Sequence, residues 1–282
     1  MILERRTKTI TTIRLDAGRF NRLYDELVFA LSRVNTAELK QCGKKSMIML
    51  GMLGIRRGIG FLRFIFVLSR LTIFEGIAIM KAVKRDRLEE LLETKGGQLS
   101  SRVKSLLSRT KKHWNDLSKR LRTKPRETIP LLFLTLIGFL FGSGGLDGNG
   151  GIPDTDIKVG IGHHRSIWTH SIIPAMVFET IVFLLLILVD TIYMKLPTNH
   201  DQLWDQLVEN NKNWAVAVTG GLGAGLAYHL FSDINFTSSQ GKAYADLPFS
   251  TTSEGHKGIL GTNAIIEILD LNKKQKNFLK TS

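Results

Sequence analysis

Side chains able to bind a metal ion gather in two short segments of this 282-residue chain. The first segment, residues 154–171, carries three of the seven histidines. The second reads AYHLFSD and places His229 four residues before Asp233, a spacing that puts both side chains on one helix face. Imidazole nitrogens and carboxylate oxygens together suit zinc, manganese or iron. The first segment contributes Asp154, Asp156, His163, His164, Arg165, His170 and Ser171.

These residue types indicate a divalent metal site, with zinc or manganese preferred, that could hold one ion or two. A metal-bound water becomes a usable nucleophile near neutral pH. Asp156, His170 and Arg165 are the candidate catalytic residues, because a guanidinium binds a phosphoryl group through two hydrogen bonds. Thr169 or Ser171 would orient a ligand. The candidate metal ligands are Asp154, Asp156, His164, His170, His229 and Asp233.

Each residue also has a structural interpretation. Asp154 follows Pro153, so its role could be limited to closing a turn. The adjacent His163 and His164 must point in different directions. A His–Asp pair at a helix end is often a structural hydrogen bond. The metal hypothesis therefore depends on the cluster as a whole, because polar groups grouped at membrane depth are costly and usually functional.

Three apolar segments are long enough to position these residues within a membrane, namely residues 129–145, 172–194 and 214–232. The third contains Gly221 and Gly225, whose spacing permits close helix contact. The sequence therefore predicts an all-α, polytopic membrane helical bundle of about three spans. A large soluble helical domain is the alternative.

The charge distribution predicts how these spans are oriented. Residues 1–128 hold 29 of the 39 Lys and Arg residues and 12 of the 25 Asp and Glu residues. The positive-inside rule places this basic region in the cytoplasm, at a bacterial inner membrane. The first span then runs outward, the second returns and the third runs outward. The loop 146–171 and the end of the third span therefore meet at one face.

The basic region is expected to form amphipathic helices. Residues 17–41 place apolar side chains at helical spacing, with a break near Gly43, and Gly96-Gly97 is expected to split residues 84–123 in two. Residues 47–83 are apolar but contain four arginines, each costing about 2.5 kcal/mol or more at the centre of a span. They fit either an interfacial helix or one or two packed helices of a bundle.

Three regions follow from this pattern: a basic amphipathic region at 1–128, a membrane domain at 129–256 and a helical tail at 257–282. The expected partners of the first are membrane lipids, in particular an anionic lipid surface, and the chain could form a homo-oligomer. Nucleic acid is not expected as a partner, because no recognised binding motif accompanies the charge. Cys42 is the single cysteine, so no internal disulfide forms. The first residues lack an apolar core, so no cleavable signal peptide is expected.

The ordered elements PDTD, HHRSIWTHS and AYHLFSD resemble those of the membrane-bound metal-dependent hydrolase family, the group that includes a LexA-binding inner-membrane hydrolase. The resemblance covers about residues 129–236. It implies that Asp154 and Asp156 match the family's acidic element and that His229 and Asp233 match its last one. Ser166 stands where the family usually has glycine, and Ile157 follows Asp156 where the family often has histidine. Its histidine element would be matched by His164, Arg165, Thr169, His170 and Ser171.

The sequence thus favours a membrane-embedded metal-dependent hydrolase acting on a phosphoester or phospholipid. One alternative is a non-catalytic membrane effector or scaffold with a structural metal site, which the basic first half supports. The other is an ion or metal transporter subunit, since ionisable groups between helices also line ion paths.

Overall fold

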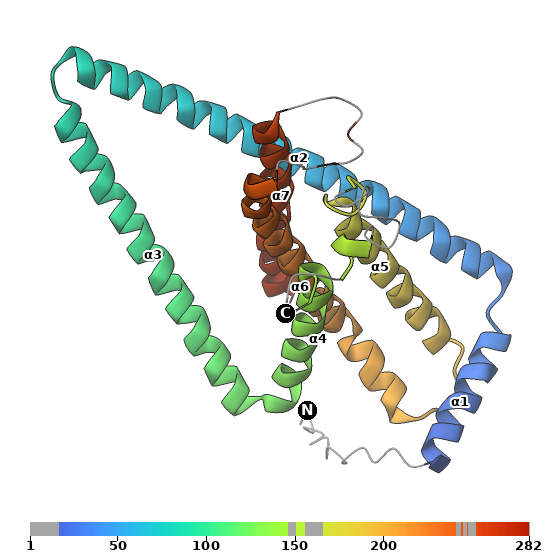
Figure 1. Cartoon of the computed structure of the whole chain (residues 1–282). Coiled ribbons are helices and arrows are strands. Elements are labelled where there is room, and N and C mark those ends of the chain that lie inside the picture. The colour runs from blue at the N-terminus through green and yellow to red at the C-terminus, as the bar shows by residue number, and fades with distance from the viewer. Residues whose placement is uncertain are drawn as a thin grey trace.

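The computed structural model describes residues 17–145, 151–155, 166–240, 244, 247 and 252–281 (Figure 1). Over these ranges the chain forms seven helices and no strand, which confirms the all-α prediction. The helices are α1 (Ala17–Ser32), α2 (Thr36–Lys84), α3 (Leu88–Thr123), α4 (Pro125–Ser143), α5 (Ile173–Tyr193), α6 (Gln202–Gln240) and α7 (Ser253–Thr281).

Three of the described helices are long and apolar enough to cross a membrane, as predicted: α4, α5 and α6 up to Ile234. The third helix is longer than expected. It begins at Gln202 and continues to Gln240. The prediction of a loop over residues 233–256 was therefore wrong for its first eight residues, which are helical. The polar composition of 235–240 favours turns, but an established helix propagates at little cost because each added residue gains a hydrogen bond. The last helix likewise begins at Ser253, before residue 257, where the helical tail was expected to start.

Glycines bring α4 and α6 into direct backbone contact. A Cβ atom added at Gly221 would collide with the carbonyl oxygen of Thr135, and one at Gly225 with that of Phe139. Two glycines of α4, Gly138 and Gly142, meet the α6 backbone in the same way. Residue numbers rise together along both helices at these contacts, so α4 and α6 run parallel. This direction agrees with the predicted topology, in which both spans run outward.

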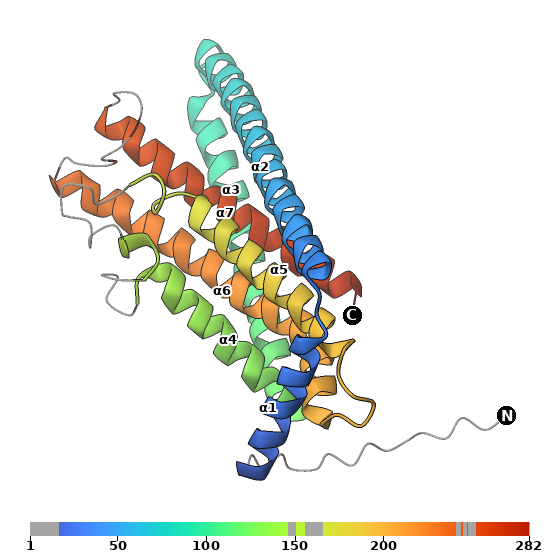
Figure 2. The ribbon, with the colours of Figure 1, turned by 90° about the vertical axis from the view of Figure 1, so that its right-hand side faces the viewer.

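The first half of α2 lies antiparallel to α5 (Figure 2). Near one end the Cys42 Sγ atom is 3.6 Å from the Thr191 Oγ1 atom, and farther along Arg57 reaches Glu179. Arg56 and Arg57 point inward to carboxylates of α5 and α7, whereas Arg63 and Arg70 are exposed. The part of α2 that contains Arg56 and Arg57 is therefore a packed helix of the bundle, which was one of the two alternatives for residues 47–83.

Several helix boundaries differ from the expected ones. The first helix ends at Ser32 rather than near Gly43, because Asn35 and Glu38 form a reciprocal capping box that starts α2. The helix α2 is 49 residues long and passes through Gly43 without a break. The helix α3 likewise runs unbroken through Gly96 and Gly97. Glycine weakens a helix by only about 1 kcal/mol, which the surrounding leucines and long polar side chains outweigh. Figure 1 shows the outer half of α2 and most of α3 standing away from the bundle.

Candidate metal centre

Asp154 is positioned by a short turn folded back onto the end of α4. The helix ends at Gly144, whose φ of 87° is left-handed, and Gly151 has a φ of 72°. The Ile152 amide donates to the Phe141 carbonyl at 3.0 Å, which ties the returning segment to the helix. The Asp154 side chain is thereby buried beside α6 rather than only closing a turn.

His170 lies in the turn that precedes α5 and is fully buried. Its backbone amide donates to the Ser166 carbonyl, and its own carbonyl accepts a 2.6 Å hydrogen bond from the Tyr244 hydroxyl. The hydroxyl of Ser171 accepts from the Ile173 amide, so this side chain caps the start of α5. The backbone of His170 is thus held by hydrogen bonds at both its amide and its carbonyl.

His229 and Asp233 lie on successive turns of α6, as their spacing predicts, and both are buried. They occupy the interior of the helix rather than its end, because α6 continues to Gln240. The glycine contacts with α4 position this face of α6 against the end of α4. There the His229 Nδ1 atom lies 3.2 Å from the Ser143 carbonyl oxygen.

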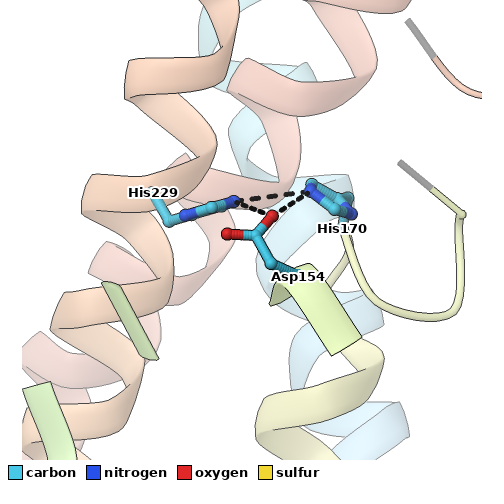
Figure 3. Close-up of side chains that lie close together, drawn as sticks. All are labelled: Asp154, His170 and His229. Carbon is cyan, nitrogen blue, oxygen red and sulfur yellow. Dashed lines mark hydrogen bonds and ion pairs between the residues drawn. The ribbon is translucent and has the colours of Figure 1, made fainter. Parts of the chain in front are cut away.

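The ligand atoms of Asp154, His170 and His229 converge, although the residues come from three separate elements (Figure 3). One nitrogen or oxygen of each lies within 4.8 Å of the others. The two Nε2 atoms are 3.4 Å apart, and each is 3.8 Å from the Asp154 Oδ1 atom. The Oδ2 atom of Asp233 is 3.3 Å from the His170 Nε2 atom and 3.6 Å from that of His229.

The other nitrogen of each ring fixes the tautomer. A carbonyl oxygen only accepts, so the Nδ1 atom of His229 must carry the hydrogen that it donates to Ser143. The Nδ1 atom of His170 lies 3.0 Å from the Thr169 hydroxyl, which can accept in the same way. The Nε2 atoms of the two rings then face each other, with these tautomers leaving a lone pair on each. Such an arrangement is typical of metal-binding histidines held by oxygen partners.

The separations match those of a tetrahedral ion. Zinc bonds to nitrogen and oxygen of roughly 2.0–2.2 Å set neighbouring ligand atoms about 3.3–3.6 Å apart. The distances among His170, His229 and Asp233 fall within this range, and those from Asp154 exceed it by about 0.2 Å. The donor set of two nitrogens and two carboxylates therefore fits a divalent metal ion.

The structure brings together four of the six candidate ligands: Asp154, His170, His229 and Asp233. The other two, Asp156 and His164, lie outside the described residues, as do His163 and the candidate catalytic Arg165. Thr169 lies where a residue orienting a ligand should lie, beside the His170 ring.

Three supporting residues were not singled out from the sequence. Tyr244 bonds the His170 carbonyl, and its own amide donates to the Nδ1 atom of His256 at 3.2 Å. Asn263 of α7 accepts from the Ile172 amide at the start of α5. Tyr244 and Asn263 are 74 and 91 positions from His170 and Ile172, which they bond. No local spacing signals such contacts, because they form only when segments distant in the sequence pack together.

Comparisons with protein-family models, with curated proteins and with solved structures gave no match to this chain. The centre is therefore defined by its own geometry: a buried group of two histidines and two aspartates at the end of an apolar helical bundle.

Proposed function

We propose that this chain is a membrane-embedded metal-dependent hydrolase that acts on a phosphoester, such as a phospholipid headgroup. The observation that carries the proposal is the convergence of the Nε2 atoms of His170 and His229 with the carboxylates of Asp154 and Asp233. These residues would hold zinc or manganese. A bound ion would supply a water molecule of lowered pKa as the nucleophile.

The location of the centre supports a lipid or other membrane-surface substrate. It lies where α4 ends and the turn before α5 begins, which is one end of the apolar spans. His170 is fully buried, while the Asp233 side chain retains 12% exposure. A substrate would therefore approach from the side of this carboxylate. The resemblance to membrane-bound metal-dependent hydrolases, together with Arg165, supports a phosphoryl group as the target.

A non-catalytic membrane scaffold with a structural metal is the second candidate. The observation that favours it is burial, since structural zinc sites use four protein ligands and keep no open position. The exposed apolar and basic surface of α2 and α3 would then bind an anionic lipid surface.

Metal analysis and hydrolysis assays separate these proposals. The protein would be purified in mild detergent without chelator, beside a His170→Ala/His229→Ala variant and a His113→Ala control, whose imidazole is exposed on α3. About one equivalent of zinc or manganese in the parent and control, lost from a folded double variant, is expected. Absence of metal from the parent would contradict both candidates.

The metal-loaded protein would then be given bis(p-nitrophenyl) phosphate and phospholipid vesicles. If the hydrolase proposal is right, the parent hydrolyses one of these substrates and the double variant does not. Chelation should abolish the activity of the parent, and restoring the metal should bring it back. A stoichiometric metal without turnover of either probe, and with loss of thermal stability on chelation, would support the structural site instead.

A further inference from the structure

A groove of about 1400 Å³ lies between α1, the first turns of α4 and the first turns of α6. Its walls are mostly apolar and include Phe20 and Leu27 of α1, Leu131 of α4 and Trp214 of α6. This volume exceeds the roughly 300–1,000 Å³ typical of small-molecule sites, so the groove suits a larger ligand.

The groove and the metal centre lie at opposite ends of the bundle. Along α6, Glu209 at the groove and His229 at the centre are twenty residues apart, which corresponds to about 30 Å of helix. That length is close to the thickness of a bilayer hydrocarbon core, about 30 Å. The groove therefore opens at the membrane face opposite the metal centre, and a ligand there is separate from the proposed substrate.

Polar contacts attach α1 to the segment between α5 and α6 and to the start of α6. The Arg19 guanidinium makes two hydrogen bonds to Asp201, of 2.9 and 2.6 Å, in the segment between α5 and α6. Glu26 accepts from the Asp201 amide and, at 2.9 Å, from the Trp204 indole. Figure 2 shows α1 at the lower end of the bundle, where these bonds attach it.

Within the described part of the chain, the aromatic side chains on the apolar face of α1 are only partly covered. Phe20 and Tyr24 both line the groove, yet their exposed fractions are 64% and 59%. An amphipathic helix of this kind lies in the plane of the membrane interface with its apolar face toward acyl chains. Tyr24, Trp204 and Trp214 together form an aromatic set of the type enriched at that depth.

Three charged residues line the groove, Arg126, Glu127 and Glu209, and of these Arg126 can bind a phosphate group. Arg126 is exposed at the start of α4, and a guanidinium binds phosphate oxygens bidentately. Its neighbour Lys124 is already paired with Glu127 at 3.2 Å, whereas within the described part of the chain no carboxylate forms an ion pair with Arg126.

We propose that this groove binds one phospholipid molecule of the leaflet opposite the metal centre. Its phosphate accepts hydrogen bonds from Arg126, and its acyl chains lie between the apolar face of α1 and the walls formed by Leu131 and Trp214. The lipid completes the packing of α1 against the two parallel spans.

Lipid counting by native mass spectrometry tests the site directly. The full chain, purified in mild detergent, would be compared with Arg126→Gln and with Leu131→Trp, which fills the groove. The matched controls are Lys124→Gln, two residues from Arg126, and Phe133→Trp, whose side chain is exposed on α4 outside the groove. We expect one retained phospholipid per chain in the parent and both controls, and at least a tenfold lower occupancy in both groove variants.

Tryptophan quenching supplies a second readout that does not depend on lipid retained through purification. Phosphatidylcholine brominated on its acyl chains would be titrated into delipidated protein, and saturable quenching near one lipid per chain is expected. A Trp204→Phe/Trp214→Phe variant should lose most of that quenching, while a Trp114→Phe/Trp168→Phe variant should keep it.

Two outcomes would overturn the proposal. One concerns lipid occupancy: either the parent carries no phospholipid, or the Leu131→Trp variant retains as much lipid as Phe133→Trp does. The other is a lipid-free dimer that Leu131→Trp converts to a monomer, which would show that a second copy of the chain fills the groove. Neither outcome affects the metal measurements, because the two sites are separated by the length of the spans.

Discussion

The Nε2 atoms of His170 and His229 lie 3.4 Å apart, although the residues are 59 positions apart in the chain. The Nδ1 atoms of these rings lie beside Thr169 and Ser143. With Nδ1 of both rings protonated, the two Nε2 lone pairs repel unless a cation lies between them. Two carboxylates at the same point add negative charge, so the centre is electrostatically prepared for a divalent ion.

The first prediction concerns the oxygen partner of His170. Replacing Thr169 by valine removes the acceptor at the Nδ1 atom and frees the ring to rotate or to change tautomer. We expect metal affinity to fall about 10- to 100-fold, as for other residues that orient a metal ligand. Competition with a coloured chelator measures this affinity.

Thr180→Val is the matched control, because that hydroxyl bonds only to the Met176 carbonyl on α5. Equal metal affinities of the Thr169 and Thr180 variants would show that the Thr169 hydroxyl does not orient His170.

The second prediction tests whether the α4–α6 contact positions the centre. A methyl group at Gly221 collides with the Thr135 backbone, whereas one at the neighbouring Gly220 meets nothing within 4 Å. Gly221→Ala should cost about 1–3 kcal/mol, by analogy with overpacked cores, and should also weaken metal binding by moving His229 away from α4. Thermal melting in detergent and metal content measure both effects.

Gly220→Ala should leave the melting temperature and the metal content close to those of the parent. Similar behaviour of the two alanine variants would mean that the helices separate easily, which the close backbone contact does not predict.

The spans and the ligand face of α6 could be predicted from the sequence because both depend on local spacing. Apolar length identifies α4, α5 and α6, and the i,i+4 relation of His229 and Asp233 places both on one face. Parallel running of α4 and α6 then brings Asp154 and His170 to the same end as His229. This prediction needed only the alternation of spans across a membrane.

The boundaries and the supporting contacts could not be predicted, because they depend on competition between local signals and tertiary packing. Glycines 43, 96 and 97 suggested breaks, but flanking helix-forming residues carry α2 and α3 through them. The interior arginines of α2 could be understood only with their partners, which lie 122 to 214 positions away. Likewise, nothing near Tyr244 in the sequence indicates its bond to His170.

The third prediction concerns the buried ion pairs that join α2 to α5 and α7. Arg57 is fully buried and bonds Glu267 at 2.9 Å and Glu179 at 3.0 Å. Replacing it by methionine removes its ion pairs with Glu267 and Glu179, although Arg56 still pairs with Glu179 at 3.3 Å. Removing one partner of a buried ion pair should lower stability by about 3–5 kcal/mol. Arg63→Met, on the exposed face of the same helix, should change it by less than about 1 kcal/mol.

A double variant distinguishes lost charge compensation from lost packing. Adding Glu267→Gln to Arg57→Met neutralises one of the two carboxylates that lost the Arg57 charge, and should recover part of the lost stability. A double variant no more stable than Arg57→Met would show that the Glu267 charge is not the cause of the lost stability. Thermal and denaturant unfolding in the same detergent provide the comparison.

The last prediction concerns the pH dependence of α1 attachment. Hydrogen bonding to Arg19 is the main cause that lowers the pKa of Asp201 below its ordinary value. A carboxyl with a depressed pKa in the folded state contributes stability above its ordinary pKa, and that contribution is lost as pH falls through the lowered value. Attachment of α1 should therefore persist to below about pH 4. Arg19→Gln should move the acid release of α1 to higher pH, since the pKa of Asp201 then rises.

The emission of Trp204 reports this release, because its indole bonds to Glu26 of α1 only while the helix is attached. The measurement would use a chain whose other three tryptophans are phenylalanine. Lys40→Gln, an exposed change in α2, serves as the charge-matched control and should leave the acid midpoint in place. If Arg19→Gln and Lys40→Gln shared one midpoint, the attachment of α1 would not depend on the Arg19–Asp201 pair, and the 2.6 Å contact would contribute only to local geometry.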